Sequence, residues 1–150
     1  MIPRLFLTLA EDLAQASGPA ECRTAISRAY YAVFNTAERL LERMGFHRPK
    51  RNPHIILRQR LLNSGDAEFA RIGSDLIELH HARVQADYFL DNRDPEKGSN
   101  AQGAVSTATT MIAALDACPI HSERWKNMRT AIARANITGA DNVIDTSSNP

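Results

Sequence analysis

The sequence has few of the features that assign a function directly. It contains two cysteines, Cys22 and Cys118, which lie far apart, and no Cys or His pair has the spacing of a zinc site. We therefore expect two free, buried thiols, no disulfide, and neither a metal nor another cofactor. Gly-rich phosphate loops, a Ser-His-Asp arrangement and paired catalytic carboxylates are also missing as recognisable motifs.

Neither charge sign dominates, since the sequence has 18 Lys and Arg and 17 Asp and Glu, which gives a formal net charge of +1. Any nucleic-acid contact must therefore come from a local patch. No apolar stretch approaches membrane-spanning length, and the mildly apolar start of the chain is soon followed by Glu11 and Asp12. We expect a cytoplasmic protein without membrane contact, and 150 residues suit one globular domain.

Helical patterns recur along the chain, whereas strand patterns do not. Gly, Pro and capping residues divide the pattern into helices at about residues 3–16, 20–44, 53–62, 66–92, 95–118 and 122–139. The predicted fold class is all-α, an antiparallel four-helix bundle with short additional helices. This domain would span residues 1–139, and a polar C-terminal tail at 140–150 is expected to be flexible.

Several helices show a defined face or cap. The helix at 20–44 carries a bundle seam with alternating spacings of four and three, made of Ile26, Tyr30, Val33, Ala37, Leu40 and Met44. In the first helix one face is shared by Leu5, Leu9, Leu13 and Ala16. Expected N-caps are Asn52, Asp66 and Asp94, and Ser122 is expected to start the last helix. Trp125 is expected to pack in the core, with a dimer contact as the alternative.

One arginine interrupts an apolar stripe on the helix at 66–92. Arg83 follows Leu79 in that stripe, and an unpaired buried charge is very costly. Asp87 lies one turn away, and a tyrosine from the helix at 20–44 is expected to join it. Two interpretations stay open: a structural ion pair, or a pocket for a phosphate or base. The candidate binding residues are Arg28, Tyr30, Tyr31, Arg83, Asp87 and Tyr88.

Three histidines are weak catalytic candidates: His54, His80 and His81. Adjacent residues on a helix point about 100° apart, so His80 and His81 are not expected to face one metal. As a general base, His81 would need a nucleophile that the sequence does not identify. The alternative for each is an ordinary packed or surface histidine.

A basic segment at 43–60 contains no acidic residue, whereas the stretch at 66–96 is rich in Asp and Glu. A local basic face holds phosphates by charge. The predicted nucleic-acid patch consists of Arg48, Lys50, Arg51 and Arg58. The alternative is a solvated loop, or a face that meets an acidic partner.

Two segments resemble the HEPN family (higher eukaryotes and prokaryotes nucleotide-binding), in its small stand-alone members. The first is Ser-Arg-Ala-Tyr-Tyr-Ala-Val-Phe at 27–34, and the second is Arg-Val-Gln-Ala-Asp-Tyr at 83–88. The resemblance covers about residues 3–118 and includes the helix start at His54. It implies a helical bundle, often a homodimer. It also implies nucleotide or RNA binding, or RNA cleavage, in toxin–antitoxin and defence systems, commonly beside a minimal nucleotidyltransferase as partner protein.

The chain departs from the ribonuclease members of that family, which carry Arg, four to six residues and then His on a late helix. Arg48 and His54 have this spacing, but Pro49 and Pro53 break the stretch. We therefore favour a binding module for RNA, a nucleotide or a partner enzyme. The rivals are a divergent metal-independent ribonuclease toxin and a purely interacting subunit.

Overall fold

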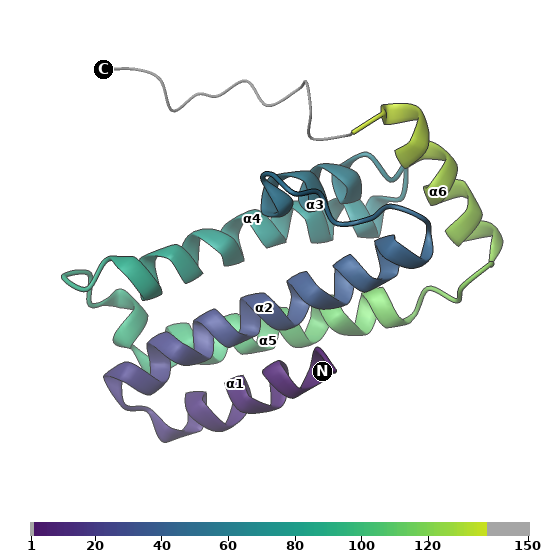
Figure 1. Cartoon of the computed structure of the whole chain (residues 1–150). Coiled ribbons are helices and arrows are strands. Elements are labelled where there is room, and N and C mark those ends of the chain that lie inside the picture. The colour runs from purple at the N-terminus through teal and green to yellow at the C-terminus, as the bar shows by residue number, and fades with distance from the viewer. Residues whose placement is uncertain (1, 138–150) are drawn as a thin grey trace, which may run out of the picture.

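The computed structural model describes residues 2–137, and this part of the chain is helical without strands, which confirms the predicted all-α class. Its six helices are joined by short connections, one of which contains a 3-10 turn (Figure 1). They are α1 (Arg4–Ala16), α2 (Pro19–Arg43), α3 (Pro53–Leu62), α4 (Ala67–Tyr88), η1 (Asp94–Glu96), α5 (Gly98–Asp116) and α6 (Glu123–Ala135). The predicted tail at 140–150 lies outside the described residues.

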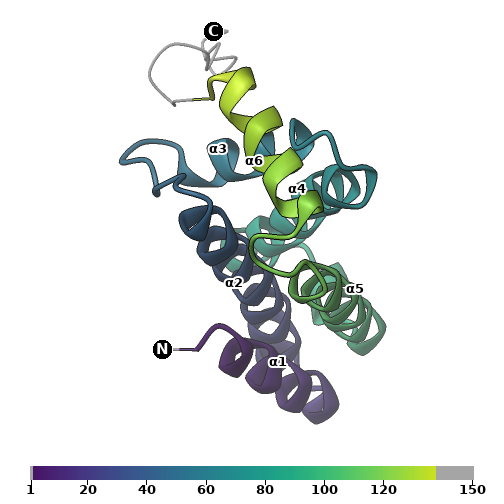
Figure 2. The ribbon, with the colours of Figure 1, turned by 90° about the vertical axis from the view of Figure 1, so that its right-hand side faces the viewer.

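Helix α2 is the central element of the fold. It packs against α1, α4 and α5, while α1 also touches α5 and α3 packs on α4 (Figures 1 and 2). Helix α6 is tied to the start of α4, because Nε of Arg124 lies 2.7 Å from the carboxylate of Asp66. Side chains of α2, α3 and α4 meet where the rings of Tyr30, His54 and His80 pack together.

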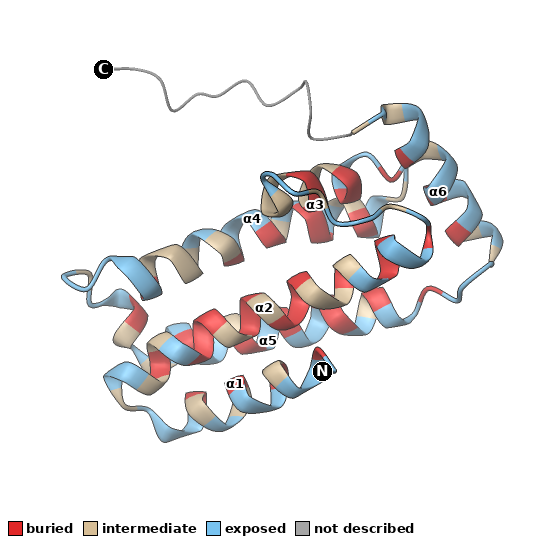
Figure 3. Ribbon diagram, in the orientation of Figure 1, coloured by how far each residue is buried: buried red, intermediate tan, exposed pale blue. Residues whose placement is uncertain are grey.

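The core follows the seam expected on α2. All six seam residues are buried, and so are small residues of the same helix, such as Ala25 and Ala29 (Figure 3). Trp125 is 3% exposed and belongs to the core, as predicted. Cys22 and Cys118 are buried free thiols, again as predicted.

The buried face of α1 differs from the stripe read in the sequence. Leu7, Ala10 and Ala14 are buried, whereas Leu5 and Leu9 are 56% and 45% exposed. This inner face packs against α2 and α5, and Ala10 and Ala14 let the helices approach closely there.

Of the three predicted caps, Asp66 is confirmed, whereas Asn52 and Asp94 are wrong. The side chain of Asp66 accepts hydrogen bonds from the backbone of Glu68 and Phe69, and Ser122 accepts one from Trp125. Asn52 instead has a left-handed backbone (φ +49°) and makes no side-chain cap. The ring of Pro53 disfavours helical backbone at the preceding residue, and Asn tolerates the left-handed region.

Helix α4 ends at Tyr88, earlier than the predicted end at residue 92, and Leu90 is 70% exposed. The cause is Arg23 on α2. Its guanidinium donates to the backbone carbonyl oxygens of Ala86 and Leu90 at 2.9 and 3.1 Å, and it pairs with Glu96 at 2.9 Å. These contacts satisfy carbonyl groups that a longer helix would have used.

Two further helix boundaries differ from the prediction. The Asp94–Pro95 pair starts the 3-10 turn, so Asp94 does not cap the next helix, and α5 begins at Gly98 with Lys97 at its N-cap position. Helix α6 ends at Ala135 because Asn136 turns into the left-handed region at φ +49°. The predicted end of this helix, near Gly139, lies outside the described residues.

Close packing of α3 on α4 fixes the position of His54. Gly73 on α4 faces α3, and a Cβ atom there would lie 3.0 Å from Cγ of Leu62 and 3.1 Å from the carbonyl oxygen of Arg58. Any side chain at position 73 would therefore push the two helices apart. His54, in the first turn of α3, is thereby held against α2 and α4.

Candidate functional site

Arg83 forms the contacts expected for an arginine in an apolar stripe. Its side chain is 14% exposed, and its Nε lies 2.9 Å from Oδ2 of Asp87. A terminal guanidinium nitrogen donates to the phenol oxygen of Tyr31 at 2.8 Å. Ser27 donates to the same Asp87 oxygen at 3.1 Å. The predicted meeting of Arg83 with a carboxylate and a facing tyrosine is confirmed, and the tyrosine is Tyr31.

Tyr31 lies between two guanidinium groups. Cζ of Arg83 is 5.3 Å from the centre of the Tyr31 ring, and Cζ of Arg28 is 5.5 Å from it. Arg83 also lies 5.3 Å from the ring of Tyr88, which is 66% exposed, and Arg28 lies 5.4 Å from Phe6. These distances are those of cation–π contacts.

The charge in this group is not balanced. Arg83 is paired with Asp87, but Arg28 makes no ion pair or hydrogen bond with any residue in the range 2–137, and its Nε is buried without a partner. The group therefore carries one uncompensated positive charge beside an aromatic ring. We call it the Tyr31 site, made of Arg28, Tyr31, Arg83, Asp87 and Tyr88.

Tyr30 does not join Arg83 but belongs to a second group. Its phenol oxygen lies 2.6 Å from Nδ1 of His54. The ring of His54 is 4.6 Å from Phe34 and 5.3 Å from His80, and Tyr30 is 5.2 Å from His80. We call Tyr30, Phe34, His54 and His80 the histidine cluster. It lies beside the Tyr31 site, since the rings of Tyr30 and Tyr31 are 5.3 Å apart.

The available donors and acceptors determine which partner of the Tyr30–His54 hydrogen bond carries the proton. Burial raises the pKa of Tyr30, so its hydroxyl keeps its proton. Tyr30 is 1% exposed, and its hydroxyl has Nδ1 of His54 as its only acceptor in the described part of the chain. The phenol therefore donates to Nδ1. Neutral His54 then carries its own proton on Nε2 and offers a donor there, not a lone pair.

Burial, together with positive neighbours, keeps His54 and His80 neutral by lowering their pKa values. Burial is the main cause that lowers the pKa of His54 to about 4, and His80, Arg83, Arg48 and Arg58 lower it further. The pKa of His80 is lowered by burial first, and then by Arg58 and Arg83. At neutral pH both imidazoles are uncharged hydrogen-bonding groups in a positive surrounding.

His80 and His81 point to different places, as their adjacency on a helix predicts. His80 faces Tyr30 and His54, whereas His81 is exposed and takes no part in the cluster. No group of three or more His, Cys, Asp or Glu side chains among residues 2–137 has the arrangement of a metal site.

The basic segment splits into a structural part and a surface part. Arg60 is buried and donates to the backbone carbonyl of His47 at 2.9 Å, so it holds the loop. Lys50 and Arg51 are exposed and Arg58 is half-buried near the histidine cluster. Arg48, in the loop, pairs with Glu38 at 3.3 Å, which leaves its charge partly compensated.

Arg48 and His54 meet across one aromatic ring. Cζ of Arg48 lies 5.6 Å from the centre of the Phe34 ring, and the imidazole of His54 lies 4.6 Å from it. As expected from the two prolines, Arg48 is in a loop and His54 is in the first turn of α3. Ser27 and Phe34 belong to the segment at 27–34 that resembles the family, but the sequence did not mark them as candidate site residues.

Comparison of the chain with models of protein families, with curated proteins and with solved structures finds no match. Within residues 2–137, no helix combines the length and the apolar character needed to cross a membrane. The Tyr31 site and the histidine cluster are the polar groups of the described residues from which a function can be inferred.

Proposed function

We propose that this chain is a HEPN-like module that binds a phosphate-bearing ligand, RNA or a nucleotide, at the Tyr31 site without cleaving it. In this proposal α1, α2, α4 and α5 form an antiparallel four-helix bundle to which α3 and α6 are added. Support comes from the two segments that resemble the family, which touch each other: Tyr31 bonds Arg83, and Ser27 bonds Asp87.

The observation that carries the proposal is the unpaired charge of Arg28 beside Tyr31. Guanidinium groups bind phosphate oxygens through a planar fork of donors, and aromatic rings stack on bases. Tyr88 is exposed next to Arg83 and offers a second ring. Arg58 adds positive charge near the histidine cluster, and Lys50 and Arg51 are exposed in the loop before α3.

The biological setting is proposed from the family resemblance. A toxin–antitoxin or defence role, a homodimer, a nucleotidyltransferase-type partner and a cytoplasmic location all belong to this proposal. A small nucleotidyltransferase encoded beside this chain would favour a two-component system. Size-exclusion chromatography with light scattering measures the oligomeric state directly. A monomer at all concentrations would contradict the proposed homodimer.

A ribonuclease is the second candidate, since Arg48 and His54 have the family's spacing and both contact Phe34. The proton on Nε2 of His54 argues against a general base at that nitrogen, because a base needs a lone pair there. Incubation of the purified protein with single-stranded RNA in the presence of a chelator separates the candidates. Intact RNA after long exposure is expected, and cleavage that is lost in His54→Gln would establish the enzyme.

Binding is tested by fluorescence anisotropy with a labelled single-stranded RNA. Arg28→Gln removes the unpaired charge and is expected to weaken binding roughly tenfold. Arg71→Gln is the matched control, because Arg71 is an exposed arginine of α4 outside the Tyr31 site. Equal weakening by both substitutions, or none by Arg28→Gln, would contradict the proposed site.

A further inference from the structure

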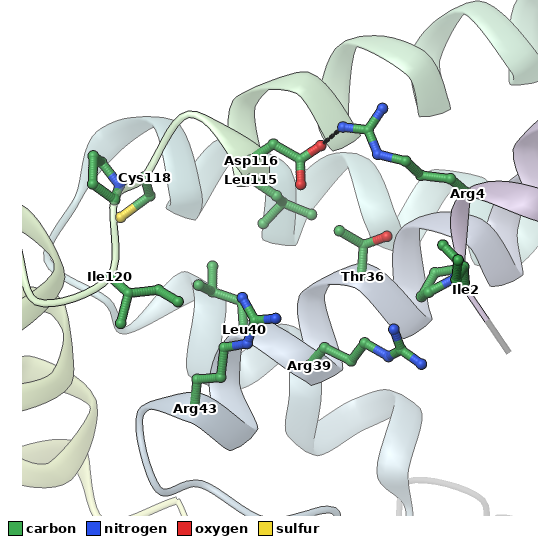
Figure 4. A pocket seen from close by; sticks show the side chains of 12 residues that line it. Ile2, Arg4, Thr36, Arg39, Leu40, Arg43, Leu115, Asp116, Cys118 and Ile120 are labelled. Carbon is green, nitrogen blue, oxygen red and sulfur yellow. Dashed lines mark hydrogen bonds and ion pairs between the residues drawn. The ribbon is translucent and has the colours of Figure 1, made fainter.

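A separate cavity lies where α1 begins, α2 nears its end and α5 passes into the connection to α6 (Figure 4). Its volume is about 350 Å³. None of the residues of the Tyr31 site or of the histidine cluster lines it. It is therefore independent of the function proposed above.

The inner wall of this cavity is apolar and its rim carries exposed isoleucines. Leu40 and Leu115 are 7% and 2% exposed and belong to the core, whereas Ile2 and Ile120 are 59% and 43% exposed. Figure 4 shows Ile2 and Ile120 on opposite sides of the opening. Apolar area left in water costs about 25 cal/mol per Å², so a ligand with an apolar body would gain by covering these side chains.

Positive charge gathers on the α2 side of the same cavity. Arg39 and Arg43 are one turn apart on α2, and both line the cavity. Arg43 makes no ion pair or hydrogen bond within the described range 2–137, whereas Arg4, across the opening, is held by Asp116. An anion in the cavity would therefore find an uncompensated guanidinium at Arg43.

We propose that this cavity binds a small amphiphilic anion, with its charged head on Arg43 and its apolar chain over Leu40 and Leu115. Carboxylate and phosphate heads share the geometry that a guanidinium fork recognises. The volume falls within the range of small-molecule sites. The Arg4–Asp116 pair joins α1 to α5 beside the opening, which favours a small ligand over a partner helix.

NMR titration of the full chain with octanoate, octyl phosphate and octanol tests this proposal. We expect saturable shifts of the backbone amides of Leu40, Leu115 and Ile120 with at least one of the two anions, and binding of octanol roughly tenfold weaker. The preferred anion identifies the head group. No saturable shift with either anion, or octanol binding as tightly as both, would overturn the proposal.

Two substitutions separate charge from apolar contact. Arg43→Gln is expected to weaken anion binding roughly tenfold and to leave octanol unchanged, whereas Ile120→Ser is expected to weaken all three ligands. Arg93→Gln is the control, since Arg93 is exposed, lacks an ion pair in the described residues and does not line the cavity. Identical anion affinities for Arg43→Gln and Arg93→Gln would contradict the assigned head-group position.

Discussion

The phenol of Tyr30 lies 2.6 Å from Nδ1 of His54 and links α2 to the first turn of α3. Because the phenol is buried and keeps its proton, it acts as the donor and fixes the tautomer of His54. The bond thus has a structural effect, since it anchors α3, and a chemical one, since it leaves an N–H at Nε2.

Replacement of Tyr30 by Phe tests this bond. Tyr30→Phe removes the donor but keeps the ring, and we expect a loss of about 1 kcal/mol in the free energy of unfolding. Nitrogen-15 NMR of the imidazole is expected to show His54 protonated on Nε2 in the parent chain and a mixture of the two tautomers in the variant. Tyr88→Phe, at an exposed ring, should change neither quantity. A parent His54 protonated on Nδ1 would contradict the assignment.

Acid is expected to destabilise the fold through His54. Its folded pKa is about 4, below the ordinary value of 6.5, so the unfolded chain binds a proton that the folded chain does not. This contribution to stability is complete above about pH 6.5, falls as the pH drops, and stops changing below about pH 4. The lowered pKa of His80 acts in the same direction.

Urea unfolding at a series of pH values measures this effect. Because His54 keeps some contact with solvent, we expect a loss of about 1–2 kcal/mol between pH 7 and pH 4.5 from this residue. His54→Gln should flatten the profile in that window, whereas His81→Gln, at an exposed histidine, should leave it unchanged. Equal slopes for the parent chain and His54→Gln would refute this origin of acid sensitivity.

Two Arg–Asp pairs on α4 share the same i,i+4 spacing but differ in burial. Arg83 and Asp87 are 2.9 Å apart with side chains 14% and 30% exposed, whereas Arg71 and Asp75 are 3.9 Å apart and 66% and 41% exposed. Double-mutant cycles with alanine should give a coupling of about 1–2 kcal/mol for the first pair and about 0.3 kcal/mol for the second. Equal couplings would mean that neither Tyr31 nor partial burial strengthens the Arg83–Asp87 pair.

Replacement of Arg23 should lower the stability of the fold more than replacement of most other arginines. Arg23→Met removes donors to several carbonyl groups at the end of α4 and its pair with Glu96, and we expect a loss of about 2–3 kcal/mol. Hydrogen exchange should become faster over residues 85–92 and stay unchanged in α1. Arg93→Met provides a control nearby, and a similar loss there would contradict the assigned role of Arg23.

Much of the architecture could be predicted from local sequence signals. Periodicity and short-range hydrogen bonding, which a sequence displays, determine the α2 seam, the cap at Asp66, the start of the last helix at Ser122 and the core position of Trp125. The end of α4 could not be predicted, because it depends on Arg23, more than sixty positions earlier in the chain. The inner face of α1 was also missed, since helix spacing and not hydrophobicity selects Ala10 and Ala14.

The candidate site was predictable to a similar degree. The need of Arg83 for a carboxylate and a tyrosine follows from the cost of a buried charge, so that contact was anticipated. The choice of Tyr31 over Tyr30, the Tyr30–His54 bond and the meeting of Arg48 with His54 across Phe34 arise from the way α2, α3 and the loop at 44–52 pack. No spacing in the sequence encodes those distances.

The salt dependence of RNA binding tests the central claim, an unpaired positive charge at the Tyr31 site, most directly. For single strands, the slope of log K against log salt falls by about 0.7 for each phosphate contact. We predict that Arg28→Gln makes the slope shallower by about 0.7, while Arg71→Gln leaves it as in the parent chain. Identical slopes for the parent and Arg28→Gln would contradict the claim that this arginine holds a phosphate.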